Sequence, residues 1–491
     1  HLEWHNLATK AMMEGEPCII FAPRSHAKCH TLDTVITLAD GSLKEAKDCK
    51  VGDEVISYDV ENFRFVPAKI VNIIDNGIKD IYEVKLASGK SIEVTSNHPF
   101  LTADGWKSIE EGLREKEKIA VPVYISRVNV KKHFTDSQLK ILAYLIAEGS
   151  VANHKKKIVF TNANREIVED LNRALEEEFG LKLKKVNTDN YDYYVAGNGK
   201  KFCKKEFLDF LEKYGLAGKY SYNKEIPKEL FTSPEADIKL FLKCLWLCDG
   251  SIYKVKRKTQ SWKNDTCIEY STSSEKLAYQ IQTLLEYIGI PSNIYRRRTP
   301  KKDNFMVSIF GGKEFKLKFL KEVLNRKTED ILDYVKKAYP STYATIPRKL
   351  VLKFLPLTPH FIRKYYGLRI DNNYDITYEK LRKLIKIFSN IPQLQLLLKA
   401  PIRWDRIIKI EYKGKKPTIG LEIEKYHNHI TNGIITHNTS YMAVMRPIFL
   451  LGHNPNLRIK IVSHSDKKAA DILRQIKEAI ESNERLKEVF P

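Results

Sequence analysis

The two ends of the chain form one nucleotide-binding pattern only when the middle is left out. Residues 17–22 (PCIIFA) predict a short buried strand, and the turn after them ends at Lys28. Thr439 opens a second apolar stretch, which is followed by another apolar run and an amphipathic segment. Strand, turn, helix and strand in this order are typical of an α/β nucleotide-binding unit. Residues 29–438 are therefore predicted to be an insertion within that unit.

Joining Lys28 to Thr439 creates a phosphate-binding loop. The joined residues read AxxxxAKT, a Walker A pattern with Ala22 and Ala27 at the positions where glycine is usual. In such a loop, backbone N–H groups surround the phosphates, Lys28 neutralises their charge, and the hydroxyl of Thr439, followed by Ser440, holds Mg²⁺. We predict that ATP and Mg²⁺ bind to Lys28, Thr439 and Ser440 only after this joining.

The joined flanks resemble the large terminase subunit, the ATPase motor of phage DNA packaging. The resemblance is carried by the HLEWHNL start, the PRxHAKTS loop and the stretch SHSDKKAADILRQIKEAIESNERLKEVFP. It implies that residues 1–28 and 439–491 are fragments of a P-loop α/β ATPase. Another P-loop ATPase is the alternative.

Length and composition point to a multidomain globular protein in a reducing compartment. A chain of 491 residues predicts roughly two to four domains, and 43% apolar with 29% charged residues excludes general disorder. No apolar run is long enough for a membrane span, and seven scattered cysteines do not indicate a disulfide framework. The CxxxC of Cys244 and Cys248 has no second ligand pair, which argues against zinc. We expect a cytoplasmic protein of a prokaryotic, possibly thermophilic, host or its virus.

The charge of the chain indicates a polyanionic partner. The net charge is +22, so nucleic acid is the first candidate. A basic, thermophile-like surface rich in Lys, Glu and Ile is the alternative explanation.

The borders of the insertion carry residues suited to acyl transfer. The insertion begins with Cys29, and alternating apolar residues with turn signals after it predict short strands and hairpins. Near the far end of the insertion, Ile407–Tyr412 and Thr418–Glu424 are again predicted to be strands. Thr95 and His98 form a TxxH box, and the insertion ends with His437 and Asn438 before the hydroxyl residue Thr439. Alone, a cysteine is usually a small buried hydrophobe and a TxxH is usually a turn. All of these features together, at the borders of a split motif, favour catalysis.

These residues resemble an intein, a protein-splicing element. The resemblance implies an all-β, horseshoe-like splicing (Hint) domain with halves at residues 29–126 and 401–438. It implies an intramolecular reaction without a cofactor, in which Cys29 converts the Lys28 amide into a thioester. His98 protonates the leaving nitrogen as general acid, and Thr95 stabilises the oxyanion.

The resemblance also assigns the second half of the reaction. Thr439 attacks the thioester through its hydroxyl, and the side-chain amide of Asn438 then cyclises and cuts the 438–439 bond. His427 and His437 assist that cleavage. One departure is Gly420, which stands where the family often has Asp, so the coordination of the two cleavages is open.

Between the splicing halves, the sequence repeats itself. Two apolar stretches, at residues 141–150 and 241–251, each end in an acid, then Gly, then Ser. The acids are Glu148 and Asp249, and each is followed by strand-like runs and an amphipathic helix. This pattern predicts an internal duplication. The plain alternative is a pair of buried amphipathic helices capped by glycine.

The duplicated region resembles a LAGLIDADG homing endonuclease with both motifs in one chain. The resemblance implies a pseudo-twofold α/β domain over residues 127–343, acting as a monomer on double-stranded DNA. Glu148 and Asp249 would be both catalytic residues and Mg²⁺ ligands, because paired acids at a scissile phosphate suit divalent-metal hydrolysis. Glu148 is a longer ligand than the usual Asp.

Basic runs follow the repeated motifs and fit a DNA-binding saddle. They comprise Lys155–Lys157, Lys254–Lys258, Arg296–Arg298 and Lys301–Lys302, interleaved with the aromatic residues Tyr253, Trp262, Tyr270 and Tyr295. Residues 344–400 predict a small helical accessory module beside the nuclease.

Two alternatives remain open at this point. The first is a splicing-only intein whose endonuclease domain binds DNA but is inactive. The second is a P-loop ATPase with a DNA-binding insertion that does not splice.

Overall fold

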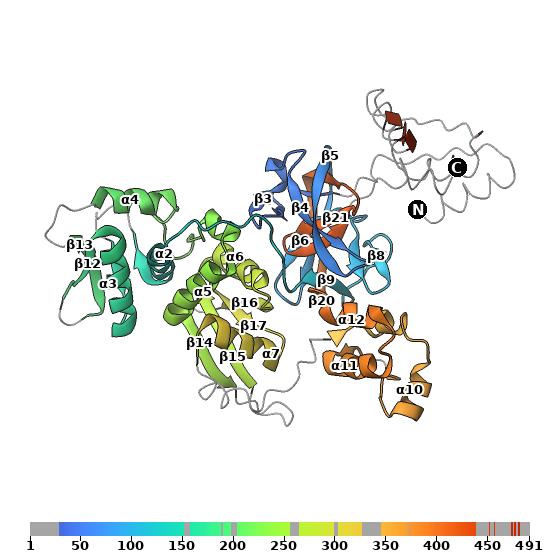
Figure 1. Cartoon of the computed structure of the whole chain (residues 1–491). Helices are drawn as coiled ribbons and strands as arrows, with labels where there is room; N and C mark the ends of the chain where they lie inside the picture. The colour runs from blue at the N-terminus through green and yellow to red at the C-terminus, as the bar shows by residue number, and fades with distance from the viewer. Residues whose placement is uncertain are drawn as a thin grey trace.

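The structure is a computed structural model in which the inserted region forms three bodies (Figure 1). It describes residues 29–151, 158–187, 190–197, 204–255, 265–298, 303–326, 345–372 and 374–437, with a few isolated positions after residue 450. Lys28, Asn438, Thr439 and Ser440 lie outside these ranges, as do the predicted P-loop flanks.

The first body is built from two antiparallel six-stranded sheets. One sheet has the order β4-β5-β6-β1-β20-β9 and the other the order β3-β2-β21-β22-β7-β8. The strands from the beginning of the chain are β1 (His30–Thr31), β2 (Val35–Thr37), β3 (Leu43–Glu45), β4 (Glu54–Asp59), β5 (Arg64–Leu86), β6 (Ser91–Val94), β7 (Phe100–Thr102), β8 (Gly105–Lys107) and β9 (Lys118–Pro122). Those from the end are β20 (Ile402–Ile423), β21 (Asn428–Thr431) and β22 (Ile434–His437).

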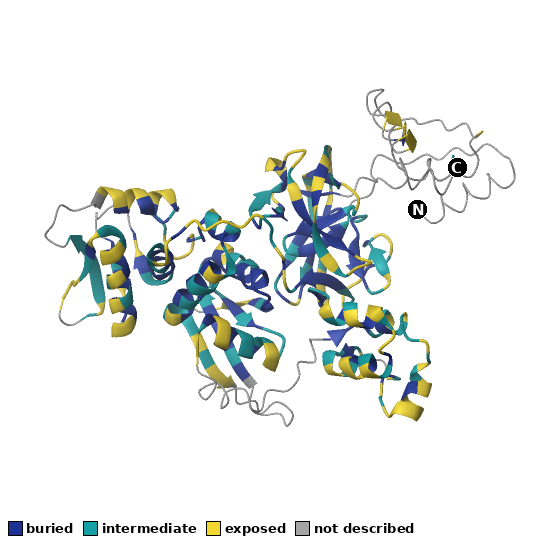
Figure 2. Cartoon of the chain, in the orientation of Figure 1, coloured by how far each residue is buried: buried dark blue, intermediate teal, exposed yellow. Residues whose placement is uncertain are grey.

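Strands from the two ends of the insertion alternate within these sheets. β1 lies between β6 and β20, and β2 pairs with β21. β21 and β22 form a hairpin, and the other edge of β22 pairs with β7. Figure 1 shows this as blue strands interleaved with red ones in a single body. These strands from the two ends of the insertion therefore form one body, and its core includes the buried residues Val84, Val94 and Ile407. Figure 2 shows buried residues concentrated in these strands.

The long strand β20 differs from the sequence expectation. The alternating pattern predicts two strands, Ile407–Tyr412 and Thr418–Glu424, but one strand continues through both and pairs with β5. The register shifts between Tyr412 and Lys415. Gly414 lies there at φ +80°, a conformation open to glycine, and the irregularity lets the strand twist without ending.

The second body repeats one unit of helices and strands. Its first copy contains α2 (Asp136–Glu148), β10 (Gly149–Ser150), β11 (Val159–Thr161), α3 (Arg165–Phe179), β12 (Leu181–Lys185), β13 (Asp192–Gly197) and α4 (Lys204–Lys213). Its second copy contains α5 (Glu235–Asp249), β14 (Gly250–Val255), β15 (Asp265–Thr272), α6 (Glu275–Tyr287), β16 (Ser292–Arg298), β17 (Asp303–Ile309) and α7 (Lys313–Lys318). The two sheets have equivalent orders, β10-β11-β13-β12 and β14-β15-β17-β16. Helices α2 and α5, which carry the repeated sequence motif, pack against each other.

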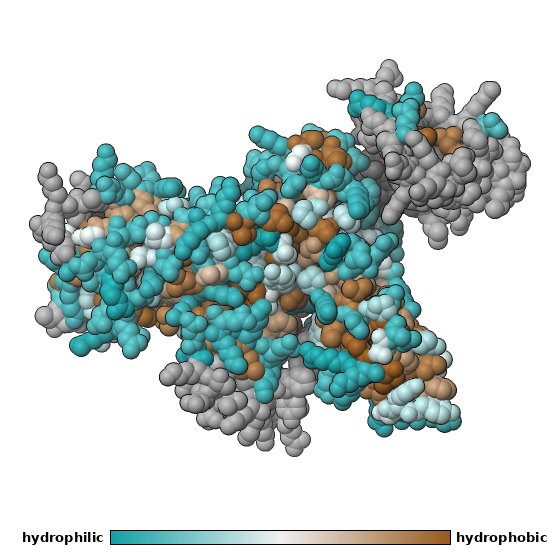
Figure 3. All heavy atoms as spheres, in the orientation of Figure 1, coloured by the Kyte–Doolittle hydropathy of each residue, from teal (hydrophilic) through white to brown (hydrophobic). Residues whose placement is uncertain are grey.

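The third body, called the helical module below, consists mainly of short helices. It contains β18 (Thr345–Ile346), α9 (Arg348–Leu352), α10 (Pro359–Tyr366), β19 (Ile376–Thr377), α11 (Tyr378–Ile387) and α12 (Pro392–Lys399). Its helices enclose their own small core, which includes Ile362, Leu381 and Leu394. On the face shown in Figure 3, hydrophobic side chains gather over this module, at the lower right.

Buried polar contacts join the second repeat to the first body. Glu286 of α6 and Lys90, which precedes β6, form an ion pair of 2.8 Å with side-chain exposures of only 2% and 3%. The hydroxyl of Tyr287 donates to the carbonyl of Gly41 at 2.5 Å, and Gln282 donates to the carbonyl of Ser88. The two bodies therefore share a desolvated interface as well as the direct chain connection from β9 to α2. Among the described residues, no helix is long and apolar enough to cross a membrane.

Candidate active sites

The nucleophile candidate Cys29 is completely buried in front of β1, beside the TxxH box. The Thr95 hydroxyl lies 3.3 Å from the Cys29 backbone nitrogen and 3.4 Å from its carbonyl oxygen. The Thr95 backbone N–H also donates to that carbonyl at 3.1 Å, and the His98 N–H donates to the Thr95 carbonyl. The box is thus a turn clamped onto the backbone of Cys29. Thr95 contacts the nitrogen that would leave in an acyl shift.

The thiol of Cys29 is neutral in this environment. Burial raises its pKa to about 12, although neighbouring Thr418, Lys79 and Asn76 lower it in part. A thiolate is the nucleophilic form, so the reaction needs a group that takes the proton as sulfur attacks.

Asn97 is a site residue that the sequence reasoning missed. Its side-chain oxygen accepts a hydrogen bond from the Thr95 hydroxyl at 2.7 Å, which orients that hydroxyl. Its position inside the TxxH box was the only available signal, because the pattern specifies Thr95 and His98 and allows any residue between them.

The described residues at the C-terminal border of the insertion belong to the β21–β22 hairpin and to the turn that precedes it. His437 ends β22, and its ring packs on Trp106 of β8 with centroids 4.6 Å apart. The His427 ring lies 6.4 Å from that of His437, and burial lowers the pKa of His427. His427 has φ +52°, a left-handed conformation that turns the chain into β21. The structure therefore brings the two predicted C-terminal histidines together.

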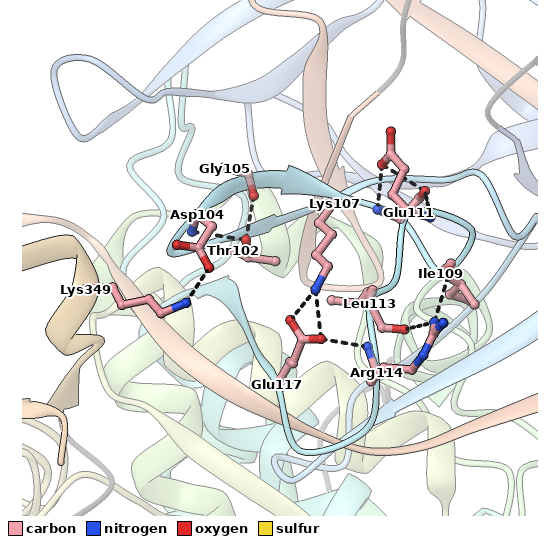
Figure 4. Close-up of polar contacts among 11 residues, drawn as sticks. Thr102, Asp104, Gly105, Lys107, Ile109, Glu111, Leu113, Arg114, Glu117 and Lys349 are labelled. Carbon is pink, nitrogen blue, oxygen red and sulfur yellow. Dashed lines mark hydrogen bonds and ion pairs between the residues drawn. The ribbon is translucent and has the colours of Figure 1, made fainter. Parts of the chain in front are cut away.

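A network of charged side chains holds the segment that carries Trp106 (Figure 4). The amine of Lys107 donates to both carboxylate oxygens of Glu117 at 3.0 Å, and the backbone N–H of Arg114 donates to the same carboxylate. The Arg114 guanidinium donates to two carbonyls of the loop, and Asp104 pairs with Lys349 of the helical module at 3.2 Å. These contacts hold the loop in place, and with it Trp106, whose ring packs against His437.

Gly420, the departure noted in the sequence, is buried on β20 opposite Ile74 of β5. It offers no carboxylate. Any group that coordinates the two borders must come from elsewhere in the site.

Glu148 and Asp249 end the two packed helices α2 and α5, and both are half-buried. Burial and the charge of Asp249 raise the pKa of Glu148, whereas Asn162 donates to its carboxylate and opposes the rise. Burial also raises the pKa of Asp249. Two neighbouring carboxylates that resist ionisation are a place where a divalent cation is favourable, so the residues fit Mg²⁺. Within the described ranges, no three His, Cys, Asp or Glu side chains form a complete metal site.

The glycine after each acid has a steric reason. A Cβ on Gly149 would stand 2.6 Å from the carbonyl oxygen of Leu145, and a Cβ on Gly250 would stand 2.4 Å from that of Trp246. The chain turns from helix into strand against its own last helical turn, and only glycine leaves room.

Lys224 is a second residue that the sequence reasoning missed. Its buried amine donates to the carbonyls of Leu145, Ile146 and Gly149 at 2.7–2.9 Å, at the end of α2. Burial lowers its pKa to about 8, and the charges of Asp249 and Glu148 limit that fall. A lone lysine between two helices carries no sequence signal, because its position follows from tertiary packing alone.

One aromatic residue predicted for the DNA-facing strands lies elsewhere. Tyr270 is fully buried against Trp246 of α5, with its hydroxyl 3.5 Å from Asp249. Alternation along β15 puts Tyr270 on the helix side of the sheet and Glu269 on the other side. Tyr253, Tyr295 and Arg296–Arg298 are exposed, whereas Lys155–Lys157, Trp262 and Lys301–Lys302 lie outside the described residues.

The sequence model of the intein splicing domain matches residues 36–438, most of the chain. The chain belongs to the intein splicing domain family.

Curated relatives of this intein span several kinds of protein. It is similar to the replicative DNA helicase DnaB of Synechocystis sp., with 26% identity over 84% of this chain and 49% of the helicase. The DnaB of Nostoc sp. is 27% identical over 84% of this chain and 49% of that helicase. The replication factor C small subunit of Methanocaldococcus jannaschii is 24% identical over 80% of this chain and 22% of that protein. The intein spans about half the length of the DnaB relatives.

Solved structures show more limited similarity. The Ssp DnaB mini-intein variant M86 is 30% identical over 22% of this chain and 68% of that chain, with a TM-score of 0.20. I-DmoI, solved in complex with DNA and Mn, is 14% identical over 39% of this chain and 98% of that chain, with a TM-score of 0.26. The family assignment rests on the sequence model, and the terminase resemblance of the flanks stays a prediction.

Proposed function

We propose that this intein excises residues 29–438 and joins Lys28 to Thr439. The observation that carries the proposal is the contact of Thr95 with the backbone nitrogen and carbonyl of Cys29, next to a buried thiol. The Cys29 N–H donates to the Thr95 hydroxyl, so the TxxH box is held against the peptide bond that the first step cleaves.

The reaction starts with the Cys29 sulfur bonding to the Lys28 carbonyl carbon as the amide nitrogen leaves. Thr439 then takes over the acyl group through its hydroxyl oxygen, and the Cys29 thiol is regenerated. The side-chain nitrogen of Asn438 then bonds to the Asn438 carbonyl carbon, the 438–439 peptide bond breaks, and the two ester-linked flanks leave with a free Thr439 amine; His437 and His427 assist this step. The remaining ester returns to an amide.

The packing of His437 supports its role in the last cleavage. Trp106 covers one side of the imidazole ring, and the His437 backbone N–H donates to the Pro99 carbonyl at 3.1 Å. A ring held in this way keeps one orientation, as a residue that transfers a proton requires.

Intact-mass analysis of the expressed chain tests this proposal. We expect a product consisting of residues 1–28 joined to 439–491, together with excised residues 29–438. Cys29→Ala and Asn438→Ala should each prevent the joined product, whereas Cys267→Ala should leave it unchanged. A wild-type chain that stays intact under warm, reducing conditions would overturn the proposal.

We also propose that the repeated domain cuts double-stranded DNA. The carrying observation is the pair Glu148 and Asp249 at adjacent helix ends, each with a raised pKa. The two carboxylates would hold Mg²⁺, which supplies activation of water and stabilisation of the leaving oxygen. Asn162 orients Glu148, and Lys224 places a cation beside both acids.

Glu148→Gln and Asp249→Asn should abolish cutting of a DNA that carries the uninterrupted insertion site, while splicing continues. Glu322→Gln, at an exposed ion pair on the same domain, is the matched control. If the wild-type protein binds this DNA with Mg²⁺ but never cuts it, the endonuclease is inactive and the intein only splices. ATP binding by the joined flanks, through Lys28, Thr439 and Ser440, remains part of the proposal.

A further inference from the structure

The side chains around the Cys29 sulfur come from the two long strands of the first body. Thr418 of β20 and Asn76 of β5 are hydrogen-bonded to the thiol, and the charge of Lys79, also on β5, acts on it. Cys29 and Thr418 are both completely buried. The sulfur therefore lies where β5 pairs with β20.

The register of three strands explains why these residues meet. Thr418 lies between Thr31 of β1 and Gly77 of β5, and directly paired residues on neighbouring strands point to the same face of a sheet. Cys29 precedes Thr31 by two residues, so these two side chains share that face. Lys79 follows Gly77 by two residues on β5 and is on the same face for the same reason.

Asn76 reaches the same place through a β-bulge. Gly77 pairs with Thr418. The next pair joins Asp75 to Ile419, so β5 has one more residue than β20 in this interval. The extra residue is Asn76, and a bulge changes the direction of a side chain relative to regular alternation. Gly77 permits the bulge with φ +65° and leaves no side chain opposite Thr418.

Thr418 and Asn76 can each donate a hydrogen bond to a sulfur anion. The Thr418 hydroxyl donates to the Gly77 carbonyl at 2.9 Å, so it accepts from the neutral thiol. When the sulfur loses its proton, this hydroxyl can turn to donate to it, because Gly77 is exposed and water can then bond to the carbonyl. One N–H of the Asn76 amide donates to the Ile74 carbonyl at 3.2 Å, and the amide has a second N–H.

Stabilising the sulfur anion meets a requirement of the first step of splicing. The thiolate is the nucleophilic form, and burial raises the pKa of the Cys29 thiol to about 12. Gly420 offers no carboxylate that could take the thiol proton. Hydrogen bonds and a cation at the sulfur oppose the effect of burial, so they raise the fraction of thiolate.

We propose that Thr418, Asn76 and Lys79 form a binding site for the sulfur anion that attacks in the first acyl shift. Thr418 and Asn76 touch the reacting sulfur and are catalytic residues, whereas Lys79 acts through its charge. One S–C bond forms to the upstream carbonyl carbon, and one C–N bond breaks. The thiol proton passes to water, and the leaving nitrogen takes a proton from His98, which regains one from water. The inference rests on the proposed splicing function and adds three residues to it.

Two rates measured on the same protein test this inference. The full-length chain carries Asn438→Ala and Thr439→Ala, so it stops at the thioester, and excess dithiothreitol releases residues 1–28 at the rate of thioester formation. In a parallel sample without dithiothreitol, iodoacetamide alkylates the Cys29 thiolate, and peptide mass spectrometry gives the rate at that residue. Both rates are compared at one pH.

The variants separate the hydroxyl, the amide and the charge. Thr418→Val removes the hydroxyl and keeps the shape, whereas Thr418→Ser keeps the hydroxyl. Asn76→Asp replaces the donor with a negative charge. Lys79→Met removes the cation, and Lys79→Arg keeps it. The matched controls are Thr102→Val, which removes a buried hydroxyl of β7 that also donates to a glycine carbonyl, and Lys85→Met, which removes another half-exposed amine of β5.

We expect Thr418→Val to slow both thioester formation and Cys29 alkylation by about 10- to 100-fold, the loss typical of a hydrogen bond to a charged group. Asn76→Asp should slow both at least as much. Lys79→Met should slow both by about five- to tenfold, and added salt should shrink this difference because the lysine is half-exposed. Thr418→Ser, Lys79→Arg and the two controls should react close to the parent rates.

A purely structural role would separate the two rates. Loosened packing exposes the sulfur, so it speeds alkylation even where it slows thioester formation. Folded Thr418→Val and Asn76→Asp chains that form the thioester at the parent rate, or that form it slowly but alkylate as fast as the parent, would overturn the inference. Lys79→Met, at a half-exposed position, keeps the test available if Thr418→Val does not fold.

The same measurements distinguish this inference from the proposed function on which it rests. If the parent releases no residues 1–28, the proposed splicing function fails. The alkylation rates of Cys29 still show in that case whether the three side chains stabilise the thiolate.

Discussion

Removing the Lys90 amine should weaken the interface between the first body, which carries Cys29, and the second repeat. The ion pair with Glu286 is 2.8 Å long and almost fully buried on both sides, and burial raises the pKa of Glu286. An exposed pair contributes about 0–1 kcal/mol, whereas breaking a buried pair costs about 3–5 kcal/mol because one charge stays without compensation. Lys90→Met should therefore lower the free energy of unfolding by about 3–5 kcal/mol.

Lys90 also links this interface to the C-terminal border. Its amine lies against Gly433, in the turn between β21 and β22, where an added Cβ would overlap it. In the same turn, Asn432 donates to the Ser91 carbonyl at 3.0 Å and accepts from the Val35 N–H at 2.8 Å. Lys90→Met should thus slow the appearance of the joined product as well.

Urea unfolding of a chain kept intact by Cys29→Ala and Asn438→Ala measures the stability effect. The control is Lys383→Met, which removes an exposed pair with Glu379 and should cost less than about 1 kcal/mol. The double substitution Lys90→Met with Glu286→Leu should recover much of the loss, because no buried charge remains. Equal effects of Lys90→Met and Lys383→Met would refute the reasoning.

Three further predictions follow from the sites. Lys224 has a folded pKa below its unfolded value, so the folded state binds fewer protons between about pH 8 and 10.5 and this residue adds stability as pH rises through that window; urea unfolding of Lys224→Met should lack the increment, which is at most about 3 kcal/mol. Trp106→Ala should leave dithiothreitol cleavage at Cys29 intact but slow release of residues 439–491 roughly tenfold, as seen by mass spectrometry, because His437 loses its aromatic wall; equal slowing of both would contradict this. Gly250→Ala should reduce DNA cutting and lower the free energy of unfolding by about 1–3 kcal/mol, because its Cβ meets the Trp246 backbone. Gly367→Ala has open space around it, so it should cost only the strain of its left-handed backbone (φ +65°), about 1 kcal/mol, and leave cutting unchanged.

The sequence predicted local features well and features that depend on distant segments less well. The repeat of an apolar helix, an acid and a glycine is a local pattern, and the two copies have the same order of elements in the structure. The border residues are recognisable because their types and positions are chemically restricted. The length of β20 was wrong, because turn-like residues around Gly414 are absorbed by an irregularity that pairing with β5 stabilises.

The sequence by itself indicated the intein family and the internal duplication, and it predicted the chemistry of the two borders, since each depends on residue type at a defined position along the chain. Only the tertiary structure revealed the contact of Thr95 with the Cys29 backbone, the placement of Thr418 and Asn76 at the Cys29 sulfur, the buried Lys90–Glu286 pair and the placement of Lys224 at the end of α2. Those features join segments up to several hundred residues apart. Burial then changes the chemistry of the groups that meet, so the same histidine or lysine acquires a pKa and a partner that no local pattern encodes.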